Sequence, residues 1–205
     1  MSVIALLIYL TGLVLAFGVR TLTAWRATGD TRFRRPDTRL FTAAWWGTGL
    51  FVLALLLGLA APLAVIATGS DSPPLAGWSG IVVMAAGLLL VLAAQTGMGD
   101  SWRIGVQENE HTELVIGGLF ALARNPIFTG MAAVLIGLAL AVPGILSAAA
   151  LFALVAGIQV QVRLVEEPYL LRTHGAAYRA YAARTGRFVP LLGRLAPTDD
   201  TEETR

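Results

Sequence analysis

Long apolar runs, without alternation of apolar and polar positions, dominate the pattern along this chain. Residues 2–19, 40–67 and 78–97 carry no charged side chain, and each approaches or exceeds the roughly 20 residues that a helix needs to cross a hydrocarbon core. A fourth apolar stretch, residues 127–165, is divided at Pro143-Gly144 into two short arms, which fits either two thin spans or a re-entrant pair. The pattern predicts an all-α integral membrane bundle of about five transmembrane helices, the last two forming a short hairpin.

The composition is typical of a membrane protein and excludes several kinds of functional site. Charged residues make up 14% of the 205 residues, against roughly a quarter in a soluble domain. The chain has no cysteine, which excludes disulfides, thiolate nucleophiles and Cys-ligated metal centres. In such a chain we expect basic residues to set the orientation in the bilayer rather than to bind nucleic acid.

Arginine is distributed unevenly between the predicted loops. Several arginines lie between Arg20 and Arg39, and another group follows residue 163, whereas the loop at residues 69–74 has none. Cytoplasmic loops carry the excess of basic residues. We therefore predict a multi-pass protein of the plasma (inner) membrane, with its amino terminus outside and its carboxyl terminus in the cytoplasm.

The segment between the third and fourth apolar runs is long and polar. Residues 98–113 include His111 together with acids and glycines, whereas most connections have about 4–6 residues. Leu114 to Phe120 then forms a short apolar stretch, strand-like or turn-like, which is interrupted by Gly117-Gly118. Glycine allows close backbone approach to a ligand, so we expect this segment to contribute to a binding site.

Two polar groups lie at the two ends of the apolar hairpin. Arg124-Asn125-Pro126 precedes the hairpin, and Glu166-Glu167 follows it. A hairpin returns to the side on which it began, so the two groups should meet at one face of the membrane. Carboxylates at membrane depth usually have a partner. The pair could bind Arg163, Arg184 or a cationic ligand, or could be a solvated helix end.

The remaining polar residues narrow the chemistry. Residues 164–185 predict an amphipathic helix with Leu164, Leu171, Tyr178 and Tyr181 along one side. The two histidines of the chain do not have metal-ligand spacing, so we expect no metal site. Phosphate-binding loops, nucleophile elbows and HExxH motifs do not occur in the sequence.

Four motifs occur in a set order over the second half of the chain. They are Leu114-Val115-x-x-Gly118-Leu119-Phe120, Arg124-Asn125-Pro126-Ile127-Phe128-x-Gly130, Glu166-Glu167-x-x-Leu170, and Gly175-x-x-Tyr178-x-x-Tyr181-x-x-Arg184 with Pro190 after it. Together they resemble the isoprenylcysteine carboxyl methyltransferase family and, more loosely, the phospholipid methyltransferases of the same superfamily. The resemblance covers residues 95–192, the expected catalytic core, whereas residues 1–67 match only in being hydrophobic. We expect one domain at residues 1–197 and a disordered tail at residues 198–205.

The resemblance implies an all-helical membrane enzyme that binds S-adenosylmethionine at the cytoplasmic face and methylates an amphiphilic substrate from the bilayer. Carried over residue by residue, it implies cofactor contacts by Thr112, Glu113, Leu114, Val115, Phe120, Asn125, Pro126, Phe128, Glu166 and Tyr178. It also implies an active site shaped by Arg124, Arg163, Glu167 and Arg184, with Tyr181 closing it.

The chain departs from the family pattern at some of these positions. The family often has histidine where Asn125 stands, and tyrosine where Phe120 and Phe128 stand. The eukaryotic enzymes place an arginine where this chain has Val162, and the nearest arginine here is Arg163. These departures leave the methyl acceptor open.

We therefore predict a monomeric, membrane-embedded, S-adenosylmethionine-dependent methyltransferase that acts on a lipid-like or isoprenoid small molecule by in-line displacement. Such a reaction depends mainly on alignment and on exclusion of water. The alternatives are a phosphatidylethanolamine-type N-methyltransferase, a sterol-reductase-like enzyme that uses NADPH, and a non-catalytic membrane protein.

Overall fold

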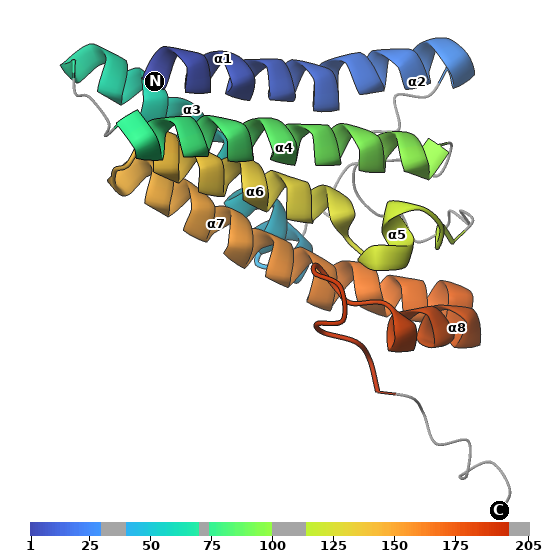
Figure 1. The fold of residues 1–205 in the computed structure, drawn as a ribbon. Coiled ribbons are helices and arrows are strands. Elements are labelled where there is room, and N and C mark those ends of the chain that lie inside the picture. The colour runs from blue at the N-terminus through green and yellow to red at the C-terminus, as the bar shows by residue number, and fades with distance from the viewer. Residues whose placement is uncertain (30–39, 70–73, 100–113, 197–205) are drawn as a thin grey trace, which may run out of the picture.

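The computed structural model describes residues 1–29, 40–69, 74–99 and 114–196, and helices dominate them. In chain order the elements are α1 (Ser2–Leu13), η1 (Val14–Val19), α2 (Arg20–Thr28), α3 (Ala43–Thr68), α4 (Pro74–Met98), α5 (Leu119–Leu122), α6 (Pro126–Ala141), α7 (Ile145–Gln161), η3 (Val162–Glu166) and α8 (Glu167–Arg184). The π-helical segments η1 and η3 continue the α-helices on either side of them (Figure 1). Within these residues the one β feature is an isolated bridge between Ala123 and Gly186, so the predicted all-α fold is confirmed.

Four helical stretches in the described part of the chain are long and apolar enough to cross a membrane. They are Ser2–Arg26, Ala43–Thr68, Leu75–Met98 and Ile145–Arg184. The apolar helix α6 has 16 residues, fewer than the roughly 20 of a full crossing. The helices run alongside one another in Figure 1. The chain is therefore a multi-pass membrane protein with a short helix in its final hairpin, as predicted, and its orientation stays a prediction.

The first helix continues beyond the uncharged run that predicted it. The expected loop begins at Arg20, but the helix extends to Thr28. Arg20 donates from Nη2 to the carbonyls of Gln95 and Gly99, at 3.0 Å each, where the negative end of the α4 dipole favours a cation. Gln95 in turn donates from Nε2 to the carbonyl of Ala16 in η1 at 3.0 Å. These bonds tie the first helix to the end of α4.

Glycines allow the helices of the bundle to approach closely. The most extensive helix contacts are those of α4 with α6 and of α3 with α7. A Cβ on Gly87 would lie 2.7 Å from the backbone nitrogen of Val134, and a Cβ on Gly137 would lie 2.5 Å from that of Met84. Small residues at contacts of this kind are typical of membrane helices. The α4–α6 contact therefore depends on these positions having no side chain.

The hairpin turns where the sequence predicts it. The helix α6 ends at Ala141 and α7 begins at Ile145. Ser147, in the first turn of α7, donates its hydroxyl to the carbonyls of Val142 at 2.7 Å and Gly144 at 2.9 Å. The turn residues are thus fixed by a buried side chain.

Helix α8 is kinked, and the kink corrects one expectation. Gly175 has φ 50° and ψ −121° inside the helix, a conformation that costs little only for glycine. Leu164 lies before the kink and is 63% exposed, whereas Tyr178 and Tyr181 lie after it and are buried. The predicted apolar side therefore holds for Leu171, Tyr178 and Tyr181, which belong to one apolar cluster, but it does not extend to Leu164.

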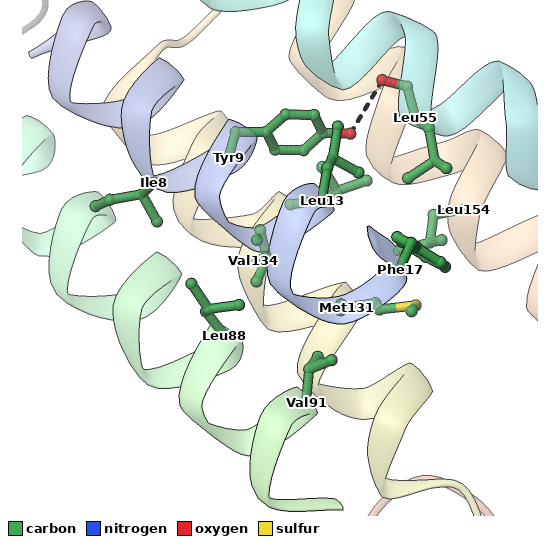
Figure 2. A pocket seen from close by; sticks show the side chains of 13 residues that line it. Ile8, Tyr9, Leu13, Phe17, Leu55, Leu88, Val91, Met131, Val134 and Leu154 are labelled. Atoms are coloured by element: carbon green, nitrogen blue, oxygen red, sulfur yellow. Dashed lines mark hydrogen bonds between the residues drawn. The ribbon is translucent and has the colours of Figure 1, made fainter. Parts of the chain in front are cut away.

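A cavity of about 60 Å³ lies inside the bundle. Its lining comes from the first helix, α3, α4, α6 and α7, and it is apolar apart from Tyr9 (Figure 2). The Tyr9 hydroxyl donates to the carbonyl of Leu55 at 3.0 Å. The lining contains no residue of the predicted cofactor site, so the cavity is separate from that site.

Candidate functional site

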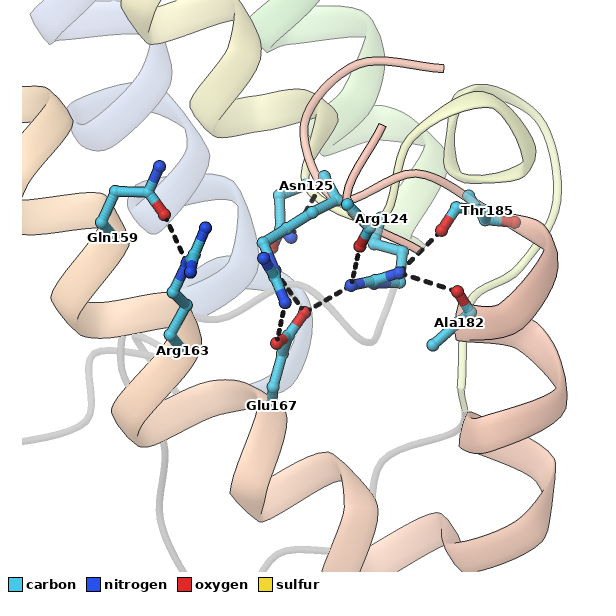
Figure 3. Close-up of polar contacts among 9 residues, drawn as sticks. Arg124, Asn125, Gln159, Arg163, Glu167, Ala182 and Thr185 are labelled. Carbon is cyan, nitrogen blue, oxygen red and sulfur yellow. Dashed lines mark hydrogen bonds and ion pairs between the residues drawn. The ribbon is translucent and has the colours of Figure 1, made fainter. Parts of the chain in front are cut away.

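The two polar groups at the ends of the hairpin meet in a buried ion pair. The Nη2 of Arg124 lies 2.6 Å from the Oε1 of Glu167, and the two side chains are 2% and 8% exposed. Arg124 lies between α5 and α6, and Glu167 is the first residue of α8. Figure 3 shows both side chains pointing toward each other. The expectation that the two groups come together is confirmed.

Backbone oxygens hold the other side of the Arg124 guanidinium. Its Nη1 donates to the carbonyls of Ala182 at 3.0 Å and Thr185 at 2.7 Å. Its Nη2 also donates to the carbonyl of Gly193 at 3.1 Å. The rigid fork of arginine suits several acceptors at once, so this side chain joins the start of α6 to the end of α8 and to the loop beyond it.

Arg187 completes the group, which we call the polar cluster and define as Arg124, Glu167 and Arg187. Arg187 binds both carboxylate oxygens of Glu167, from Nε to Oε1 at 2.8 Å and from Nη2 to Oε2 at 2.9 Å. Bidentate pairs of this kind are among the stronger hydrogen-bonded contacts in proteins. The hydrogen bond to Glu167 raises the pKa of Arg187 above its ordinary value. Glu167 is thus held between two guanidinium groups.

The two arginines that the sequence suggested as partners of the acidic pair make other contacts. Arg163 donates from Nε to the Oε1 of Gln159 at 2.8 Å, in an exposed position apart from Glu167 (Figure 3). Arg184 donates from Nε to the carbonyl of Ala180, one turn earlier in its own helix. Both arginines therefore lie outside the polar cluster.

Asn125 fixes the start of α6 against the chain that follows α8. The backbone nitrogen of Arg124 donates to the carbonyl of Gly186 at 2.8 Å. The backbone nitrogen and the side-chain Nδ2 of Asn125 both donate to the carbonyl of Arg187 at 3.0 Å. Pro126 is the first residue of α6, as expected from its fixed φ and missing N–H. Asn125 therefore has a positioning contact in this structure.

Glu166 has a different environment from its neighbour. It is partly buried, and its Oε1 accepts a bond of 3.3 Å from the Nε2 of Gln161. In the described residues, ion pairs with arginine are seen for Glu167 but not for Glu166. The carboxyl group of Glu166 therefore has an amide, and no arginine, as its partner among the described residues.

Aromatic side chains lie beside the polar cluster. The Tyr181 hydroxyl donates to the carbonyl of Phe120 at 2.5 Å. Tyr178 is buried and makes an edge contact with Tyr181, with ring centroids 6.2 Å apart. Leu114 packs against the apolar cluster that these two tyrosines form with Ala182. The structure therefore brings the first and last of the predicted motifs together.

The remaining predicted residues have mixed outcomes. Val115 and Phe128 lie near the two ends of the segment from Leu114 to Phe128, and both are partly buried. Thr112 and Glu113 lie outside the described residues. Arg187, which no motif predicted, is central to the polar cluster. Arg187 is one of several arginines in the tail, and nothing in the sequence around it identified it as a partner of Glu167.

Comparison with known proteins bears on the same half of the chain. A family model described as phospholipid methyltransferase matches residues 75–177. A search of curated proteins found no match. The matched span runs from α4 into α8 and includes Arg124, Glu166 and Glu167. Since it covers half of the sequence, the chain belongs to the phospholipid methyltransferase family, in the superfamily that its motifs resemble.

Proposed function

We propose that this protein is an S-adenosylmethionine-dependent methyltransferase acting on a lipid-like or isoprenoid small molecule at the cytoplasmic end of the bundle. Membership of a membrane methyltransferase family supports the reaction class. The observation that carries the proposal is the pair of adjacent carboxylates in unlike settings. Glu167 is neutralised inside the polar cluster, whereas Glu166 accepts a hydrogen bond only from an amide among the described residues.

The residues present fit the cofactor. S-adenosylmethionine carries an ammonium group and a sulfonium group, which are both cationic, and Glu166 offers a carboxyl group that no described arginine binds. Phe120 and Tyr178 are buried beside Tyr181, next to the polar cluster. In the proposed site Glu166 binds the ammonium group, and the segment from Leu114 to Phe128 forms the opposite wall.

The chain's own contribution to the reaction is positioning. When bound, the cofactor supplies a methyl group that its sulfonium centre already activates. The polar cluster holds the start of α6, the start of α8 and the loop after α8 in one arrangement, and such alignment can supply much of a rate enhancement. Both oxygens of Glu167 accept bonds from guanidinium groups, so Glu167 is poorly placed to take a proton. This favours an acceptor that reacts without deprotonation, such as a carboxylate.

Cofactor binding is the first test. Purified protein in detergent is titrated with S-adenosylhomocysteine and, separately, with NADPH, by calorimetry. We expect binding of S-adenosylhomocysteine, lost in Glu166→Gln and retained in the control Arg179→Gln, which changes an exposed residue of α8. Thermal melting of both variants checks that they remain folded. Binding of NADPH alone would overturn the proposal, and unchanged binding by a folded Glu166→Gln variant would show that the site is misplaced.

The acceptor requires a transfer assay. Protein in nanodiscs receives cofactor with a radioactive methyl group, together with either a prenylated cysteine or phosphatidylethanolamine. Label in the carboxyl ester of the first acceptor supports the carboxylate preference. Label in the headgroup of the second supports the phospholipid acceptor that the family name suggests.

A further inference from the structure

The chain after α8 forms a loop with an exposed apolar tip. We call residues 186–195 the return loop, because the chain there turns back from the end of α8 toward α7 (Figure 1). At its tip Val189 is 50% exposed, Leu191 68% and Leu192 66%. Three large apolar side chains exposed within four residues are unusual on a surface that faces water. We therefore expect another apolar surface to cover the tip.

The exposure is built into the loop. The backbone nitrogen of Arg187 donates to the carbonyl of Leu192 at 2.7 Å, and that of Leu192 donates to Val189 at 3.2 Å. The nitrogen of Leu195 donates to the carbonyl of Ala182 in α8 at 3.0 Å. Leu191 has φ 71°, a conformation that is disfavoured for a residue with a side chain. A closed and hydrogen-bonded loop holds these side chains outward.

The base of the loop lies against the start of a membrane helix. The carbonyl of Gly186 accepts from the backbone nitrogen of Arg124, just before α6. The carbonyl of Phe188 accepts from the hydroxyl of Thr129 at 2.6 Å, in the first turn of α6. From residue 186 to residue 188 the chain therefore advances alongside α6 into its apolar part. The tip follows directly at residue 189.

Charges flank the tip on both sides. Arg184 precedes the loop and Arg194 lies near its end, and both are exposed. Basic side chains next to apolar ones are typical of segments at the membrane interface, where the cation binds phosphate and the apolar group enters the acyl region. A water-facing protein partner would not require the loop to run along α6.

We propose that the return loop is a membrane-inserted lip, with Val189, Leu191 and Leu192 in the boundary between headgroups and acyl chains of the leaflet beside α6. The occupant of the apolar tip is the phospholipid leaflet. The same loop supplies Arg187 to the polar cluster and accepts a bond from Arg124 at Gly193. The lip therefore connects the leaflet to the polar cluster. This inference goes beyond the proposed reaction and does not depend on it.

The cysteine-free chain allows a direct test of depth. Single variants Leu191→Cys and Leu192→Cys carry a nitroxide label in nanodiscs of phosphatidylcholine and phosphatidylglycerol. Leu56→Cys, 60% exposed on α3, is the reference in hydrocarbon, and Arg179→Cys on α8 is the reference in water. Collision rates with oxygen and with a nickel chelate report depth. We expect the chelate to reach both tip labels several-fold less often than the Arg179 label, while oxygen reaches them more often.

Two outcomes would overturn the proposal. One is chelate access at both tip labels equal to that of the Arg179 label, which would place the tip in water. The other is shielding from both reagents that disappears when each nanodisc holds one protein molecule, which would make a second copy the occupant. Two tip positions keep the result interpretable if one variant fails to fold. Because no cofactor or acceptor is present, the result is independent of the proposed methyl transfer.

Discussion

The apolar bundle and the polar cluster hold their segments together by different means. In the bundle, α4 and α6 meet where Gly87 and Gly137 leave room for backbone atoms. In the polar cluster, Arg124 makes directed bonds to one carboxylate and to several carbonyls. The helix contact in the bundle depends on shape complementarity, whereas the contacts in the polar cluster depend on charge and on hydrogen-bond direction.

The difference determines what each region tolerates. Apolar side chains of similar volume can usually replace one another in a packed core at small cost, so most positions of the bundle leave many choices. The positions without a side chain are the exception. In the polar cluster every member is a partner of another member, and removal of one leaves a buried charge or acceptor without its bond. Substitutions at the two regions should therefore differ in size and in chemical selectivity.

The largest effect is expected from Arg124→Ala. The variant leaves Glu167 with one guanidinium partner and removes the donor to Ala182 and Thr185. Removal of one partner of a buried pair costs about 3–5 kcal/mol, and we expect the free energy of unfolding to fall by a similar amount. Reversible unfolding in mixed micelles of SDS and a mild detergent measures this change.

The matched control for this variant is Arg184→Ala. Arg184 is exposed and bonds to the carbonyl of Ala180 in its own helix, so its loss should change the free energy of unfolding by no more than about 0.5 kcal/mol. Equal effects of the two substitutions would mean that the polar cluster does not join the three segments.

The apolar half of the fold follows from the sequence because membrane helices are identified by hydrophobicity alone. The spans near residues 40–67 and 78–97 are observed as α3 and α4, and Pro143-Gly144 lies at the hairpin turn. The first helix is longer than the sequence predicts, because Arg20, which ends the uncharged run, lies inside the helix. The bonds from Arg20 to the end of α4 could not be predicted because they join residues far apart in the sequence.

The polar end could be predicted only in part. The meeting of Arg124 and Glu167 could be predicted because a helical hairpin returns to the side of the membrane on which it began. This holds whatever the number of residues between them. The role of Arg187 was missed because it depends on the direction of the chain after the kink at Gly175. Hydrophobic pattern says nothing about that direction. An arginine in a tail rich in arginine resembles its neighbours until the backbone is placed.

The second prediction tests the shape-dependent contact with Gly137→Ala. The added Cβ would lie 2.5 Å from the backbone nitrogen of Met84, so α4 and α6 must separate. Overpacking of this kind costs about 1–3 kcal/mol. The control is Gly49→Ala in α3, where nothing lies within 4 Å of the added atom and the helix should gain about 0.5–1 kcal/mol. The same unfolding measurement applies, and effects of equal sign would contradict the close approach.

The smallest effect is expected from Tyr9→Phe, and it sharpens the comparison between the regions. Tyr9 donates to Leu55 inside α3, where the carbonyl can also accept within its helix, so the loss should be about 0.6 kcal/mol. Tyr181→Phe removes the donor to Phe120, whose usual helical partner, the nitrogen of Arg124, donates to Gly186 instead. Its loss should be larger, because a buried acceptor then has no bond. Unfolding in mixed micelles measures the change in the free energy of unfolding for both variants. A larger change for Tyr9→Phe would contradict the view that directed hydrogen bonds matter more at the polar end than in the bundle.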